Sequence, residues 1–151
     1  MTLDRVILSI TPSDRAALEG LVEATMDVVE PSDATVYLLY LFPDGDYEST
    51  LERMDIEPTS GALSPDEVAA RHDSVRTPAS MLDAHDIDYE IRGVAGGDAS
   101  GQVVKRADEL DADLVVVAGR QRSPTGKAMF GDHAQQVLLN AATPVLYVTR
   151  E

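Results

Sequence analysis

Five short runs of apolar or alternating residues recur along this 151-residue chain, and a stretch with helical periodicity separates each run from the next. The runs are residues 5–10, 35–42, 88–94, 114–118 and 144–149. Runs this short, rich in β-branched residues, are typical of strands rather than helices. Strands that alternate with helices predict a parallel sheet, because parallel neighbours need a right-handed crossover that a helix supplies. We therefore predict an α/β fold, a doubly wound five-stranded parallel sheet with helices on both faces.

The pattern within each run indicates how deeply its strand is buried. Residues 35–42 and 114–118 are continuously apolar, as expected for strands covered on both faces. Residues 88–94 alternate apolar and charged side chains, which favours a half-exposed edge strand. We expect the run at 114–118 to be central, because it is the most apolar of the five.

Start signals mark three of the helical segments. Ser13, Ser64 and Asp98 each precede a helical pattern and can accept a hydrogen bond from its first turn. Pro78 lies inside the helical pattern that follows Ser64, and proline lacks the N–H that a helix would use there. We therefore expect a bend near Arg76.

Residues 43–63 interrupt the alternation of strands and helices. They hold six carboxylates against one arginine and show no sustained period. We predict an acidic loop excursion at 43–63, within a single domain that spans residues 1–151.

The chain carries a formal net charge of −15, from 27 acidic against 12 basic residues. Nucleic acids and anionic membranes bind basic faces, so this charge argues against both as partners. Only two of the cations are lysine, Lys105 and Lys127. This acid-rich, lysine-poor balance is typical of proteins from extreme halophiles, and an ordinary acidic cytosolic protein is the alternative.

Neither cysteine nor a long apolar run occurs in the sequence. Without cysteine, disulfides and thiolate metal ligands cannot form, and a reducing compartment is allowed. A membrane-spanning helix needs about 18 or more consecutive apolar residues, and a secretory signal needs a basic and then apolar N-terminus. The sequence shows neither pattern, so we expect a cytoplasmic protein.

The segment after the fourth run combines glycine with positive charge. Its glycines are Gly119, Gly126 and Gly131, and its cations are Arg120, Arg122 and Lys127. Glycines let backbone N–H groups approach a phosphate closely, and the N-terminus of the following helix adds partial positive charge. The pattern predicts a site for a nucleotide or another anion, and the alternative is a flexible turn with surface arginines.

Asp132 and His133 open the last helical pattern. Asp132 can cap this helix, with Gln135 completing a capping box, which explains the aspartate structurally. The Asp132 carboxylate and a bound triphosphate would repel each other, unless Mg²⁺ lay between them and bridged both groups. His133 faces the predicted cradle, where it could contact a phosphate. His72 lies on an apolar stripe, where we expect a partly buried, hydrogen-bonded side chain. No two histidines have metal-ligand spacing with a carboxylate, so we predict no resident metal site.

The chain resembles the universal stress protein family in element order, in length and in the segment after the fourth run. That family carries a glycine after its fourth strand, a second glycine three residues on, and a Gly-Ser or Gly-Thr pair before its last helix, which hold ATP. Gly119 and Gly131 correspond to the outer glycines. Arg122 stands where the second glycine would be, and Asp132 replaces the hydroxyl residue.

The resemblance implies a Rossmann-like fold of the adenine nucleotide alpha hydrolase type, with the strand order 3-2-1-4-5. In that order the winding direction reverses between strands 1 and 4, where open α/β sheets bind ligands at the carboxyl ends of their strands. The loops at this switch point are Thr11, Pro12 and Ser13, and residues 119–131.

The resemblance also implies ATP or AMP as the ligand. The family commonly reads the adenine edge with an aspartate after strand 1, and Thr11 stands at that position, with Asp14 three residues on. The backbone at Leu41 and at Val94 would supply the other base contacts implied by the resemblance.

The run at 144–149 forms the last strand, at the sheet edge in the implied order. Only two residues follow it, so we expect its outward backbone groups to be uncovered. Pairing with the same edge of a second copy, about a two-fold axis, would satisfy these backbone groups. We predict a homodimer with contacts from Val145, Leu146, Tyr147 and Val148.

Two functions stay open. The first is a stress-response regulatory protein that binds an adenine nucleotide or another anion at the switch point. The second is a family member that binds no nucleotide and acts only through its dimer and a regulatory partner protein. An enzyme of nucleotidyl transfer or hydrolysis is disfavoured, because no acid–base pair is visible in the sequence.

Overall fold

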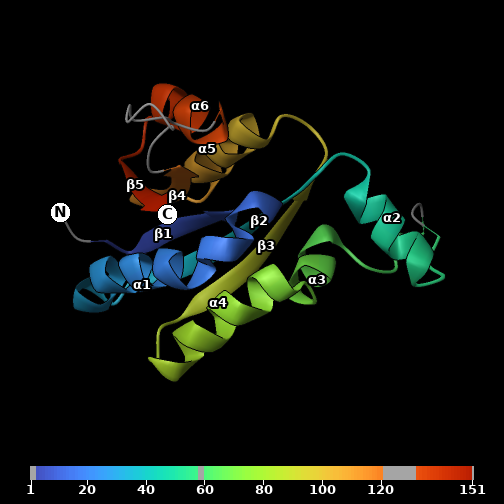
Figure 1. The fold of residues 1–151 in the computed structure, drawn as a ribbon, viewed down its shortest axis with the longest axis horizontal. Coiled ribbons are helices and arrows are strands. Elements are labelled where there is room, and N and C mark those ends of the chain that lie inside the picture. The colour runs from blue at the N-terminus through green and yellow to red at the C-terminus, as the bar shows by residue number, and fades with distance from the viewer. Residues whose placement is uncertain (1–2, 58–59, 121–131, 151) are drawn as a thin grey trace.

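The computed structural model describes residues 3–57, 60–120 and 132–150. Its five strands form one parallel sheet in the order β3-β2-β1-β4-β5 (Figure 1). The strands are β1 (Arg5–Ile10), β2 (Thr35–Phe42), β3 (Tyr89–Ala95), β4 (Leu114–Arg120) and β5 (Val145–Arg150). The predicted fold class and strand order are confirmed, with β3 at one edge and β4 inside the sheet.

Helices cover both faces of the sheet. The 3₁₀ helices are η1 (Pro12–Ala17) and η2 (Glu30–Ser32), and the α-helices are α1 (Leu18–Val29), α2 (Asp46–Arg53), α3 (Pro65–Ala70), α4 (Asp73–Ala84), α5 (Ala99–Glu109) and α6 (Asp132–Asn140). In Figure 1, α1, α3 and α4 lie on one face and α5 and α6 on the other, whereas α2 lies farthest from the sheet. Within the described ranges, no helix combines the length and the apolar character needed to cross a membrane.

The hydrophobic core has two layers, one on each side of the sheet. On one side, Leu8 of β1 and Leu21 of α1 belong to the same buried cluster. On the other side, Val115 of β4 is buried with Val103 of α5 and Val137 of α6. Complete burial of each such side chain contributes about 1.5–3 kcal/mol to the free energy of unfolding, so the two layers stabilise the sheet from both faces.

The edge strand β3 is covered by the first turn of α3. The N–H of Gly93 donates to Oδ1 of Asp66 at 2.7 Å. A Cβ at Gly93 would collide with the backbone carbonyl of Pro65, so a glycine is needed for this close approach. The contact satisfies one outward backbone group of an edge strand, which would otherwise be open to pairing. Ser64 caps α3 as predicted, accepting from the Glu67 N–H at 3.2 Å.

The segment predicted as an acidic loop at 43–63 contains a helix, α2. Its single fully buried side chain is Leu51, which is 1% exposed and packs against the core. Only Tyr47 and Leu51, four residues apart, are apolar in this eight-residue helix, and a pattern of two residues is too short to distinguish a helix from a loop. The loop prediction was therefore wrong for residues 46–53.

Pro78 does not end the helix, because α4 runs from Asp73 through Pro78 to Ala84, and the helical pattern breaks earlier, at His72. The His72 Nδ1 accepts from the Ser74 N–H at 3.2 Å, which makes His72 the N-cap of α4. Its Nε2 is hydrogen-bonded to the Tyr40 hydroxyl at 3.1 Å. The cap interrupts the helix, and the prediction that His72 is partly buried and hydrogen-bonded is confirmed.

Three helices end in the same motif, an aspartate with a left-handed backbone. Asp55, Asp86 and Asp111 follow α2, α4 and α5 with φ values of 60°, 56° and 50°. The residue after each aspartate donates its N–H to a carbonyl five residues earlier, as from Ile87 to Leu82 at 3.0 Å. This is the Schellman hydrogen bond, and aspartate tolerates the left-handed region better than most side chains. An acidic residue thus serves where glycine is the more usual choice.

Candidate functional site

The strand order brings two groups of predicted site residues to the carboxyl edge of the sheet. β1 lies between β2 and β4, and its pairing with β4 runs from Val6–Leu114 to Leu8–Val116. Thr11 follows β1 directly, and Gly119 is next to last in β4. The winding direction reverses between these two strands, so this edge is the switch point of the sheet.

Part of the predicted site lies outside the described residues. These positions are Arg122, Gly126, Lys127 and Gly131, together with the side chains of Ser13, Arg120 and Asp132. Pro12 and Ser13 are the first residues of η1, and Asp132 and His133 are the first residues of α6. The described geometry therefore concerns the ends of β1 and β4 and the start of α6.

Thr11 is tied to Asp14 by two hydrogen bonds. Oδ2 of Asp14 accepts from the Thr11 N–H at 2.9 Å and from the Thr11 hydroxyl at 3.1 Å. Thr11 is therefore the N-cap of η1, so the predicted cap at Ser13 was wrong and α1 begins only at Leu18. Asp14 is 4% exposed. Asp14 of η1 therefore places a carboxylate beside Thr11 at the end of β1, although Thr11 itself stands at the position where the family commonly has an aspartate.

Ser9 and His133 connect β1 to α6. The Ser9 hydroxyl and the His133 Nε2 are 3.1 Å apart. Burial lowers the pKa of His133 below 6.5, although the nearby carboxylates of Asp14 and Asp98 act to raise it. The imidazole is therefore mainly neutral near pH 7 and supplies no full positive charge to a phosphate there. Ser9 is 1% exposed, so the pair is not open to a substrate as a nucleophile and its base.

Gly119 lies under the side chain of Tyr147. A Cβ at position 119 would overlap the tyrosine ring, which comes from the adjacent strand β5. With the tyrosine ring in this position, the packing of β5 on β4 leaves no room for a Cβ at position 119, independently of any ligand.

Leu41 and Val94 are direct partners on the adjacent strands β2 and β3. They are 3% and 6% exposed, and both side chains belong to the core layer under α5 and α6. Only their main-chain atoms are thus candidates for contact with a base.

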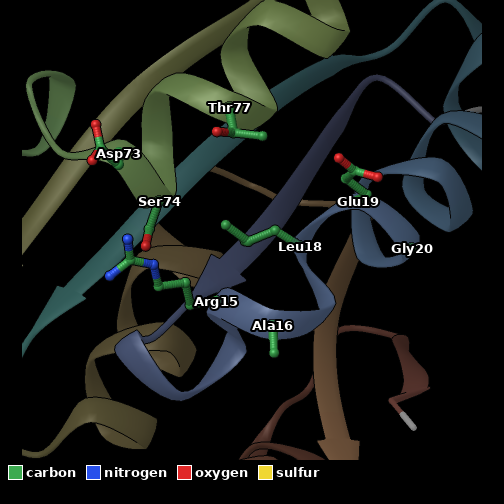
Figure 2. Close-up of a pocket in the computed structure, with 8 residues that line it drawn as sticks. All are labelled: Arg15, Ala16, Leu18, Glu19, Gly20, Asp73, Ser74 and Thr77. Atoms are coloured by element: carbon green, nitrogen blue, oxygen red, sulfur yellow. The ribbon is translucent and has the colours of Figure 1, made fainter.

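Three of the concavities in the described part of the molecule surround η1. One of about 350 Å³ lies between η1, α1 and the ends of β4 and β5, with Ala118 and Thr149 in its wall. A second, of about 470 Å³, lies between η1, the start of α1 and the start of α4 (Figure 2). A third, of about 500 Å³, lies between η1, α2 and the junction of α3 with α4. The first of these touches the switch point.

The family model of the universal stress proteins matches residues 4–149. The chain belongs to the universal stress protein family. A universal stress protein of Mycolicibacterium smegmatis is 36% identical over 93 residues, which make up 62% of this chain and 72% of that protein.

Two solved structures of universal stress proteins from Archaeoglobus fulgidus share the fold of this family member. One has a TM-score of 0.69 at 24% identity and covers 99% of this chain and 100% of that chain. The other is a complex with dAMP, with a TM-score of 0.65 at 19% identity and the same coverage.

Sequence reasoning missed the group around His133 in this universal stress protein. Ser9 contacts the His133 ring, and the charges of Asp14 and Asp98 act on its pKa. These residues come from β1, η1 and the turn before α5, so no local spacing indicates the group. One signal was available, because Thr11 and Asp14 have the three-residue spacing of a capping box.

Proposed function

We propose that this universal stress protein binds an adenine nucleotide, AMP or ATP, at the switch point and acts as a cytoplasmic stress-response regulator. The observation that carries the proposal is the position of β4 beside β1. The end of β4 consequently lies beside the end of β1, which Thr11 follows, and the glycine- and cation-rich residues continue from β4 in the sequence. Glycine-rich segments with cations before a helix are suited to phosphate, and the dAMP complex of a protein with the same fold supports an adenine nucleotide.

The residues suit the phosphates of a nucleotide better than its base. Arg120, Arg122 and Lys127 supply positive charge in an otherwise acidic chain. At the base end, the Thr11 hydroxyl is already bonded to Asp14, so a base would share or displace that hydrogen bond. With ATP, the carboxylate of Asp132 would meet phosphate charge, and Mg²⁺ would offset the repulsion.

Calorimetry with AMP, ATP and inorganic phosphate tests the proposal. Because a hydrogen bond to a charged group contributes about 1.5–3 kcal/mol, Lys127→Ala should weaken nucleotide binding about tenfold or more. The matched control is Lys105→Ala. Lys105 is the only other lysine, lies on α5 and pairs with Glu109 at 3.9 Å. The Lys105→Ala variant should leave nucleotide affinity unchanged.

The role of Asp132 is tested by Asp132→Ser, which restores the small hydroxyl residue of the family signature. Removal of the negative charge should strengthen AMP binding. If ATP binding in the presence of Mg²⁺ instead becomes weaker, the carboxylate acts through a bound metal ion.

The second candidate is a family member that binds no nucleotide and acts through its dimer and a partner protein. Two contacts favour it. Gly119 is explained by the Tyr147 ring, and Thr11 is explained by its bonds to Asp14, so neither residue needs a ligand. No heat with any of the three probes, and no nucleotide detected by mass spectrometry in the protein as isolated, would select this candidate.

We further propose that the acidic surface is an adaptation to concentrated salt, as in halophilic proteins. The net charge of −15 and the scarcity of lysine support this proposal. The aspartates that close α2, α4 and α5 are consistent with it, because they place carboxylates where glycine would serve.

A further inference from the structure

Three arginines line one concavity on the α1 face of the molecule, outside the switch point. Arg15 of η1, Arg53 of α2 and Arg71 after α3 all line the cavity of about 500 Å³ between these elements. Small-molecule sites have volumes of about 300–1,000 Å³, so the cavity has room for a small ligand. Three separate elements thus bring positive charge to one place in a chain of net charge −15.

These three arginines form no ion pair within the described residues, whereas three of the four other arginines with described side chains do, Arg5 being the exception. In the part of the chain that the structure describes, Arg76, Arg92 and Arg106 each pair with a carboxylate. None of the three cavity arginines forms such a pair there, although acidic residues outnumber basic ones by 27 to 12. The cavity holds these three arginines against two aspartates, Asp46 and Asp73, so an excess of positive charge remains that favours a bound anion.

The elements that carry the arginines are held in position. The Nη2 of Arg53 donates to the Thr50 hydroxyl at 3.2 Å, and α2 is anchored by the buried Leu51. The junction that carries Arg71 is held by His72, whose ring bonds to the Ser74 N–H and the Tyr40 hydroxyl.

Arg15 connects this cavity with its neighbour. Figure 2 shows Arg15 extending from η1 toward the first turn of α4, near Ser74 and Asp73. Arg15 and Asp73 line both the cavity in Figure 2 and the arginine-lined cavity, so the two concavities adjoin.

The same cavity also presents hydrogen-bond acceptors. Asp46, Asp73 and Thr50 line it together with the arginines. The two carboxylates would repel a bare anion, but they accept hydrogen bonds from hydroxyl groups. The arginines match phosphate oxygens, because the guanidinium group donates in a planar fork.

We propose that this cavity binds a phosphorylated sugar or polyol, with the phosphate on the arginines and hydroxyl groups on Asp46 and Asp73. The site is distinct from the proposed nucleotide site, because none of its lining residues is among those of the nucleotide site, although both sites use η1. The proposal does not depend on nucleotide binding.

Calorimetric titration with ribose 5-phosphate, inorganic phosphate and ribose tests this proposal, at the lowest KCl concentration at which circular dichroism shows the protein folded. Ribose 5-phosphate should bind more tightly than either fragment, with or without saturating AMP. Arg53→Gln and Arg71→Gln should each weaken it about tenfold or more. Arg106→Gln on the opposite face is the matched control and should leave the affinity unchanged.

Several results would overturn the proposal. They are the absence of saturable binding of ribose 5-phosphate, loss of binding when AMP is added, and an equal loss in Arg106→Gln. Inorganic phosphate that binds as tightly as ribose 5-phosphate would refute the role assigned to the carboxylates. Circular dichroism of each variant confirms the fold, and Arg15→Gln repeats the test from a different element.

Discussion

Tyr147 of β5 occupies the space above Gly119 of β4, where any larger residue would need room for its side chain. Gly119 is also the residue that corresponds to the first glycine of the family's ATP signature. The position of the Tyr147 ring thus gives this glycine a packing role, whether or not a nucleotide binds beside it. Its mutation would act on stability as well as on binding, and the two effects must be measured separately.

Gly119→Ala should destabilise the protein. Insertion of a methyl group into a packed space typically costs about 1–3 kcal/mol, and we expect a loss of free energy of unfolding in that range by urea denaturation. Gly20→Ala is the matched control, because a Cβ at this position of α1 has no atom within 4 Å. It should raise stability by up to about 1 kcal/mol, since alanine favours the helix. Equal stabilities of Gly119→Ala and wild type would show that the ring moves away freely.

The Ser9–His133 contact predicts a pH dependence of stability. The folded-state pKa of His133 is lowered from 6.5 because burial disfavours the charged ring. As the pH falls through 6.5, the unfolded chain gains a proton that the folded chain does not bind. The free energy of unfolding should therefore fall as the pH drops below 6.5, until the folded pKa is reached.

Urea denaturation over a series of pH values, in wild type and His133→Gln, measures this contribution. The difference between the two slopes isolates His133, because His72 and His85 are present in both proteins. Parallel slopes for the two proteins below neutral pH would contradict the burial of a neutral imidazole.

The melting temperature should rise with KCl concentration. Fifteen excess negative charges repel each other, and screening shortens their range from about 10 Å at 0.1 M to about 3 Å at 1 M salt. Differential scanning calorimetry over this range tests the expectation. A flat or falling melting temperature would remove the argument for adaptation to salt.

Repulsion between negative charges can also be tested at a single residue, Glu23 of α1. Glu19, Glu23 and Asp27 are exposed and follow each other at four-residue spacing along α1. Glu23→Gln removes two like-charge pairs, each unfavourable by about 0.2–0.5 kcal/mol, so it should stabilise the protein at low salt. The gain should vanish in molar KCl, and a gain that persists there would have another cause.

The edge strand β5 should mediate a homodimer. In the described part of the chain it pairs with β4 on one side only. Leu139 of α6, a helix that contacts β5, is 70% exposed and is an apolar side chain that a partner could cover. Light scattering in molar KCl should give about twice the chain mass of 16.2 kDa, because an uncovered strand edge is expected to pair with its own copy.

Val145→Lys should convert this dimer to a monomer, because a charged side chain on the shared strand opposes its pairing. The matched control is Met54→Lys, which places the same charge on an exposed apolar residue just after α2. It should remain dimeric. A wild-type monomer at micromolar concentration would show that the edge is protected in another way.

The sequence by itself determined the class of fold, because its signals are local. The continuous apolar run at 35–42 and the alternating run at 88–94 predicted β2 as a buried strand and β3 as an edge, and both are confirmed. The capping signals at Ser64 and Asp98 are also confirmed. Each depends on neighbours within a few residues, so periodicity and spacing were sufficient. The order of the strands came from the family resemblance, since pattern alone does not order them.

Tertiary structure decided the features that depend on contacts between distant segments. The His72 ring that caps α4 is bonded to Tyr40, 32 residues earlier, and the side chain of Leu51 in α2 is buried in the core. The Ser9–His133 bond spans 124 residues. The arginines of the proposed phosphate cavity come from three elements whose distances are set by packing rather than by spacing in the chain. Such groups assemble only when the core brings their elements together, and for that reason local sequence does not predict them.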